Sequence, residues 1–263
     1  MAAALLAWSA GLASVAGAAA APNSAGDQAF ASYAFASEFG SGIYEFNGRS
    51  LQIYRIPLSI EREGWRVTLP VTIGLVDFRS SDVINLNFPR GIGSVSLVPG
   101  LERDFVLTPD WTLTQFLRAG YTKTSGQAAD AVVASIGLRS DLRRNQTLFH
   151  SELGYAVADL RGPAPGDAYL RLRNAIQFDL ATTTGVGEHR LHVSPYVLVD
   201  VYAIPPRSPV SSQDIQRTQM EPGLSFSLEP RPARLGIPLP ALGISYRIAG
   251  ELSGWRLAIG APF

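Results

Sequence analysis

The sequence contains no cysteine, which excludes disulfide bonds, thiolate metal sites and a cysteine nucleophile. It also carries no net charge, because its 22 Lys and Arg residues balance its 22 Asp and Glu residues. A neutral chain has no overall attraction for nucleic acid, so we expect no nucleic-acid partner. The sequence has no P-loop, no glycine-rich dinucleotide loop and no EF-hand loop, and we therefore expect no cofactor.

Long hydrophobic runs are missing beyond the N-terminus, although 46% of the residues are hydrophobic. A membrane-spanning helix needs about 20 consecutive apolar residues, which no later segment provides. Residues 1–21 are small and apolar with several small-x-small sites, which predicts a secretory signal peptide. No Lys or Arg precedes this run, so a retained Ala-rich helix or a disordered tail is the alternative. We expect residues 22–40 to form a short lead-in or a segment inside the lumen of the domain that follows.

Alternation of apolar and polar residues dominates the chain from Gly42 onward. In the segment 169–180, Leu170 and Leu172 share one face while Arg171 and Arg173 share the other, which a helix would mix. We predict an all-β fold over residues 41–263: a transmembrane antiparallel β-barrel of about 12 strands with a short N-terminal lead-in segment. The strands are expected near 42–47, 50–61, 65–79, 91–106, 109–123, 129–140, 146–159, 168–183, 188–203, 214–228, 235–248 and 252–263.

A soluble β-sandwich or lipocalin-like barrel would also alternate, but its core should be apolar. Here one face of each strong strand is apolar along almost its whole length, and the other face is polar and charged. This inside-out pattern predicts export through the periplasm to the outer membrane of a Gram-negative bacterium, with membrane lipid as a partner. Aromatic residues near the strand ends are expected to form interfacial girdles; they are Trp65, Phe78, Trp111, Tyr121, Phe149, Tyr202, Tyr246, Trp255 and Phe263.

The connections are expected to differ between the two ends of the barrel. If both chain ends face the periplasm, the periplasmic turns are short, at 61–64, 107–110, 141–145, 184–187 and 229–232. The opposite end then holds the connections 80–90, 123–128, 160–167 and 204–213, most of them longer. Asn47-Gly48 is the best single candidate for a tight hairpin turn, because both residues tolerate positive φ.

The last strand ends in an aromatic residue with apolar residues at alternate positions behind it. This pattern resembles the terminal signal that the outer-membrane assembly machinery reads, and we expect that machinery as a partner. The candidate recognition residues are Trp255, Leu257, Ile259 and Phe263.

Four short segments carry a family resemblance: Gly42-Ile43-Tyr44, Leu51–Pro57 (LQIYRIP), Pro99–Glu102 and Asp110–Leu113. They resemble solitary outer-membrane autotransporter-like β-barrel domains, and the resemblance extends roughly over residues 38–263. It implies a twelve-stranded barrel with a short segment in its lumen. The segment 22–40 leaves no room for a secreted passenger domain, so we do not expect self-secretion.

Catalytic signals are sparse among the three histidines, His150, His189 and His192. His189 and His192 are expected on opposite faces, which is poor geometry for one metal site, and we expect no bound metal. Two pairs share a lumen face, His192 with Ser194 and His150 with Glu152, but no G-x-S-x-G elbow is present. We therefore expect no enzymatic activity and keep an outer-membrane lipid-modifying enzyme as an alternative.

Charged side chains on the lumen faces are the candidate functional residues. They either pair with one another and plug a narrow barrel, which we favour, or line a polar channel. The predicted function is a structural or small-solute-conducting, porin-like barrel whose ligand is unknown; the other alternative is a translocation or assembly module for a separately encoded exported partner. Arg139, Arg143 and Arg144, in or beside a predicted turn, are expected to be solvated or to contact an anionic partner. The lumen candidates are Glu102, Arg118, Arg171, Arg173, Asp179 and Asp200, with Asp104 and Glu152 beside them.

Overall fold

The computed structural model describes residues 41–46, 49–56, 58–76, 92–124, 130–161, 166–186, 188–206, 216–229, 233–234, 237–238, 241–249 and 252–259. The predicted signal peptide at 1–21 and lead-in at 22–40 lie outside these ranges, as do Asn47, Gly48 and Phe263. In the described ranges, no helix is long and apolar enough to cross a membrane.

All named elements are β-strands, so the predicted all-β class is confirmed. The strands are β1 (Gly42–Phe46), β2 (Arg49–Ile56), β3 (Ser59–Arg62), β4 (Trp65–Thr68), β5 (Val71–Val76), β6 (Ile92–Leu97), β7 (Gly100–Thr108), β8 (Trp111–Thr124), β9 (Asp130–Arg144), β10 (Thr147–Arg161), β11 (Asp167–Phe178), β12 (Leu180–Val186), β13 (His189–Ile204), β14 (Thr218–Glu229), β15 (Ala233–Arg234), β16 (Ile237–Pro238), β17 (Leu242–Arg247) and β18 (Leu252–Ile259).

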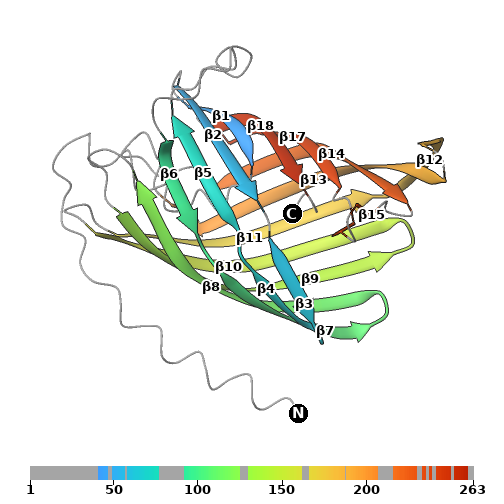
Figure 1. The fold of residues 1–263 in the computed structure, drawn as a ribbon, viewed down its shortest axis with the longest axis horizontal. Helices are drawn as coiled ribbons and strands as arrows, with labels where there is room; N and C mark the ends of the chain where they lie inside the picture. Colours follow the sequence, from blue (N-terminus) through green and yellow to red (C-terminus); the bar gives the residue numbers. More distant parts are fainter. Residues whose placement is uncertain are drawn as a thin grey trace.

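Strand pairing is antiparallel and leads around one large sheet (Figure 1). From β8 the pairs run through β6, β5, β2, β1, β18, β17, β14, β13, β11, β10 and β9, and β9 pairs with β8 again. The first strand of this sheet, β1, lies beside the last, β18, and they pair over five residues from Gly42↔Arg256 to Phe46↔Leu252. β15 and β16 form a separate two-stranded sheet.

Several predicted strands are interrupted in the structure. The predicted strand 65–79 is divided into β4 and β5 around Pro70, and 91–106 into β6 and β7 around Pro99. Proline has no N–H to donate to the strand ladder, which explains why the regular pairing stops there. The predicted strand 168–183 is also divided, into β11 and β12 at Asp179, although no proline lies there. The number of barrel strands therefore stays a prediction, because it depends on how interrupted strands are counted.

The two faces of the sheet are chemically opposite, as the alternation predicted. On β13, Ser194, Tyr196 and Asp200 are buried, whereas the alternate residue Val201 is exposed. Large apolar side chains are exposed on most of the long strands, including Val67, Leu101, Leu117, Leu153, Leu172, Leu224, Ile244 and Leu257. The buried face carries the polar and charged residues, so the interior of this barrel is polar and its outside is apolar.

Short turns at one end join successive strands. Glu63 and Gly64, with φ of 53° and 77°, connect β3 to β4, and Asn145, with φ of 54°, begins the turn from β9 to β10. Pro109 and Asp110 connect β7 to β8. These turns lie at or within one residue of the predicted positions, whereas most of the connections at the opposite end lie outside the described residues.

Two glycines on the inner face leave space for aromatic rings. A Cβ on Gly137 in β9 would come within 2.2 Å of Cζ of Phe116, and a Cβ on Gly223 in β14 within 2.4 Å of Cζ of Tyr196. The buried rings of Phe116 and Tyr196 thus cover glycine backbone on the neighbouring strand. Such pairs fix the register of neighbouring strands, because a slip by one residue would bring a side chain against the ring.

The predicted aromatic girdle is wrong at Tyr202. Its side chain is buried, and its ring makes an edge contact with Tyr169 at a centroid distance of 6.0 Å. Tyr202 has the same parity on β13 as Asp200, so alternation places it in the lumen. The other described members, Trp65, Trp111, Tyr121, Phe149, Tyr246 and Trp255, are exposed.

Candidate functional site: the charged lumen and its mouth

Strand register places polar and charged residues in one row across the inner face. Thr114, Arg139, Glu152, Arg173 and Asp200 lie directly opposite one another on β8, β9, β10, β11 and β13. From Arg139 onward the charge alternates at each strand. Opposite charges on neighbouring strands stabilise the pairing, so this row helps to define both the register and the filling of the lumen.

Glu102 is the centre of the first ion-pair network. Its carboxylate is buried and accepts hydrogen bonds from Arg66 at 3.0 Å, Arg118 at 3.1 Å and Arg139 at 3.1 Å. The second guanidinium nitrogen of Arg66 binds Asp104 at 3.0 Å, and Asp104 also accepts a bond from Thr114. Four strands, β4, β7, β8 and β9, are thereby cross-linked through one carboxylate.

Asp200 is the centre of the second network. It accepts two parallel bonds from Arg173, at 2.8 and 3.0 Å, the geometry in which an arginine fork is strongest. Arg171 binds Glu152 at 2.6 Å and lies 3.9 Å from Asp200. Both arginines and both carboxylates are buried, so these charges are compensated by one another rather than by bulk water.

Glu221 continues the second network across β14, β17 and β18. It accepts bonds from Ser245 at 2.7 Å, from Arg247 at 3.1 Å and from Arg256 at 2.8 Å. Arg247 also lies 3.7 Å from Asp200 and joins the two carboxylates. Because β18 pairs with β1, this cluster holds together the part of the wall where the first and last strands meet.

Asp179 lies apart from both networks, level with the β9–β10 turn, where its N–H donates to the carbonyl of Gln146. Its carboxylate accepts bonds from Gln177 and Ser194, both at 2.8 Å, and from Arg143 at 2.5 Å. Partial burial favours a raised pKa, but the hydrogen bonds from these three residues outweigh it and lower the pKa of Asp179 below its ordinary value.

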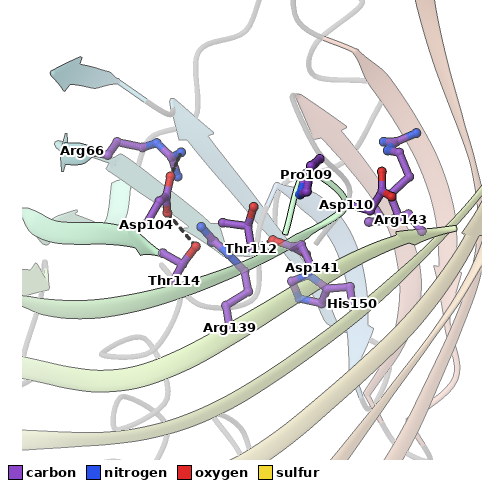
Figure 2. A pocket seen from close by; sticks show the side chains of 11 residues that line it. Arg66, Asp104, Pro109, Asp110, Thr112, Thr114, Arg139, Asp141, Arg143 and His150 are labelled. Atoms are coloured by element: carbon purple, nitrogen blue, oxygen red, sulfur yellow. Dashed lines mark hydrogen bonds and ion pairs between the residues drawn. The ribbon is translucent and has the colours of Figure 1, made fainter. Parts of the chain in front are cut away.

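A pocket of about 500 Å³ lies at the short-turn mouth of the lumen (Figure 2). Its wall includes Arg66, Asp104, Arg139, Asp141 and His150, and the turn residues Pro109 and Asp110 border it. In Figure 2, Asp141 lies beside His150, whose Nδ1 is 2.7 Å from the carboxylate oxygen. Thr114 and Arg139 also line it. Glu102, two residues before Asp104 on β7, does not line the pocket and is buried beneath three guanidinium groups.

The histidines and serine of the lipid-hydrolase alternative have other contacts. Ser194 donates to Asp179, while Nε2 of His192 lies 3.7 Å from Glu229. The second predicted pair was His150 with Glu152. The carboxylate at hydrogen-bond distance from His150 is instead that of Asp141, on the neighbouring strand. The absence of enzymatic activity stays a prediction.

The six lumen candidates predicted from the sequence are distributed over these groups. Glu102 and Arg118 belong to the first network, Arg171, Arg173 and Asp200 to the second, and Asp179 to the mouth. Sequence reasoning missed five charged members of the networks: Arg66, Arg139, Glu221, Arg247 and Arg256. Their alternation parity could have identified them, because each is separated by an even number of positions from a residue that faces the lumen.

The arginines around the β9–β10 turn are separated by the structure. Arg139 faces the lumen, where it pairs with Glu102 and lies 3.4 Å from Asp141, so placing it in a solvated turn was wrong. Arg143 pairs with Asp179, and Arg144 is exposed at the end of β9.

The predicted assembly signal lies on β18. Trp255 and Leu257 point outward, and the ring of Trp255 contacts Tyr246 on β17 at a centroid distance of 5.2 Å. Phe263 and the side chain of Ile259 lie outside the described part of the structure. Recognition of these residues by assembly machinery stays a prediction.

Comparison with known proteins gives similarity among solved structures. No family model matches the sequence, and no curated protein matches it. Among solved structures, the chain is similar to the β domain of the Bordetella autotransporter BrkA, at 14% sequence identity and a TM-score of 0.44, over 82% of this chain and 93% of that one.

Proposed function

We propose that the chain is an integral outer-membrane β-barrel with a structural role, whose ion-paired lumen does not conduct solutes freely. The observation that carries this proposal is the inverted burial of its side chains. Asp200 and Glu221 are 0% exposed and Arg247 is 1% exposed, whereas Trp255 and Leu257 are 58% and 53% exposed. A protein folded in water buries its large apolar groups and exposes its charges, so this arrangement fits lipid around the barrel.

The outward surface is favourable only when lipid covers it. Burial of apolar surface contributes about 25 cal/mol per Å², and each long strand presents several large apolar side chains to the outside. Strands can cross a bilayer only when their backbone groups are paired, and the pairing that leads from β8 back to β8 provides this. In this proposal the short turns face the periplasm, as they do in bacterial outer-membrane barrels.

The lumen argues for a structural rather than a conducting barrel. A conducting channel needs a continuous water-filled path past the charged residues, whereas Asp200, Glu221 and Arg247 are inaccessible to water. Glu102 does not line the pocket at the mouth, and its carboxylate is covered by three guanidinium groups. The proposal assigns no catalytic step to the barrel.

Single-channel recording in a planar bilayer tests the lumen assignment. The purified full chain is inserted into lipid vesicles, its insertion is verified by resistance to detergent before heating, and the vesicles are fused with the bilayer. We expect no steady conductance from the native protein. Stable, ohmic conductance steps from the inserted barrel would contradict the structural role and favour the conducting one.

A further inference from the structure

Arg103 is a charged residue on the outward, apolar face of the barrel. It lies on β7 between the outward residues Leu101 and Phe105, directly opposite Trp65 on β4 and Gln115 on β8. Its guanidinium carbon is 4.6 Å from the ring centroid of Trp65 and 5.4 Å from that of Phe105. Both distances lie within the range of cation–π attraction, so the rings hold this cation in place.

Arg103 has no carboxylate partner in the described part of the chain, unlike the arginines of the lumen networks. An uncompensated cation on a lipid-facing surface is unfavourable in the hydrocarbon region and favourable where anionic groups are available. The aromatic rings compensate the charge only in part. The position of Arg103 relative to the bilayer therefore decides what binds it.

Trp65 gives that position, because it is the first residue of β4 after the Glu63–Gly64 turn. Arg103, directly opposite Trp65, lies level with this short turn, and the outward apolar row continues past it on β7 through Phe105 and Leu107. Trp side chains prefer the headgroup region, and an arginine beside one reaches that region by extending its charged end toward the interface. On the other side of Trp65, β3 places Arg62 in the same outward row, exposed and 3.5 Å from Glu63.

We propose that the row Arg62–Trp65–Arg103–Gln115 binds the phosphate of an anionic phospholipid in the periplasmic leaflet. Arg103 supplies a planar fork that matches two phosphate oxygens, and the amide of Gln115 supplies a further donor beside it. Trp65 and Phe105 orient the fork and contact the glycerol and upper acyl chain. Glu63 lies beside Arg62 at one end of the row, whereas the ion pairs of the described residues include none at Arg103, so the preference for an anionic headgroup rests on Arg103. The site rests on the proposed membrane-barrel function.

Native mass spectrometry of the detergent-purified full chain tests this site with two probes, phosphatidylglycerol and phosphatidylcholine. We expect the native protein to retain phosphatidylglycerol preferentially, and Arg103→Gln to reduce that retention about fivefold, the effect of losing one interfacial cation. Arg103→Lys should restore part of the retention, since it keeps the charge and loses the fork. Arg217→Gln, which removes an exposed arginine just before β14, at the end of the barrel opposite the short turns, is the matched control and should leave retention unchanged.

Two results would overturn the lipid site while leaving the barrel intact. One is equal retention of phosphatidylglycerol by the native chain and Arg103→Gln; the other is equal retention of both lipids by the native chain. Each protein is also run on a gel with and without heating. A native chain with no heat-dependent shift would count against the membrane barrel itself, so failure of the two proposals can be distinguished.

Discussion

At the scale of single residues, the lumen is defined by carboxylates that each serve several arginines. Glu102 accepts from three guanidinium groups and Glu221 from two; both carboxylates are buried, and of the five arginines Arg66 is the most exposed, at 26%. Removing a carboxylate leaves its arginines as uncompensated buried charges, which costs more than the ion pairs themselves contribute. The networks therefore make the interior intolerant of single charge changes.

Glu221→Gln is the most direct test of that intolerance. We expect it to lower the free energy of unfolding by about 3 kcal/mol, because Arg247 and Arg256 lose the charge that compensates them. The readout is the urea midpoint of the vesicle-inserted protein. Glu61→Gln is the control: Glu61 is exposed and 3.7 Å from Arg66, so its loss should cost less than about 1 kcal/mol. Equal effects of the two changes would contradict the network.

Asp179 predicts a pH dependence at the mouth of the lumen. Its pKa is lowered in the folded protein by the bonds from Gln177, Ser194 and Arg143, so its stabilising contribution is present above the unfolded-state pKa, about 4. This contribution is lost as the pH falls through the folded pKa. The native chain should therefore be more stable than Asp179→Asn at pH 7, and the difference should shrink below about pH 4. Urea midpoints of both proteins, measured at several pH values, check this; a difference independent of pH would contradict it.

At the scale of strands, the glycines that face aromatic rings fix how neighbouring strands align. Gly137 and Gly154 are register partners on β9 and β10, yet their surroundings differ. A Cβ on Gly137 would meet the ring of Phe116 at 2.2 Å and the carbonyl of Leu153 at 2.5 Å, whereas a Cβ on Gly154 has no contact closer than 3.8 Å. The first position requires glycine and the second does not.

Gly137→Ala should thus lower the free energy of unfolding by about 1–3 kcal/mol through overpacking. Gly154→Ala, at the neighbouring position, should be neutral or slightly stabilising, because alanine is less flexible in the unfolded chain. The urea midpoints of the two variants are compared with that of the native chain. Loss of stability in Gly154→Ala with none in Gly137→Ala would contradict the packing described for β8, β9 and β10.

Alternation predicted which face a residue occupies, and it did not predict what that residue touches. It placed Arg171, Arg173 and Asp200 in the lumen because a strand repeats every two residues. The bonds among them depend on register between β11 and β13, which a single sequence does not specify. The alternating pattern also predicted continuous strands across Pro70 and Pro99. The strands are interrupted there because proline has no N–H to donate to the ladder.

The pocket at the mouth could not be predicted from the sequence, because it too depends on strand register. Arg66, Asp104, Asp141 and His150 come from β4, β7, β9 and β10, and only the folded sheet brings them together. Alternation predicts that His150 pairs with Glu152, because residues two positions apart on a strand share a face. Its hydrogen-bond partner is instead directly across the ladder, at Asp141.

At the scale of the whole molecule, the barrel is apolar on its outer face and ion-paired on its inner face. In the proposed membrane barrel, lipid covers the outer face. Strand pairing leads around the wall, and the networks centred on Glu102, Asp200 and Glu221 lie in the interior. Such a fold should resist detergent until it is heated, because no strand is released without breaking both backbone pairing and buried ion pairs.

Gel mobility of the outer-membrane fraction, with and without boiling, tests this account most directly. We predict that the chain is recovered in that fraction and migrates differently before and after heating, since the unheated barrel stays folded in the detergent. Recovery of the chain as a soluble periplasmic protein, with no change of mobility on heating, would contradict the membrane barrel and the lipid site that rests on it.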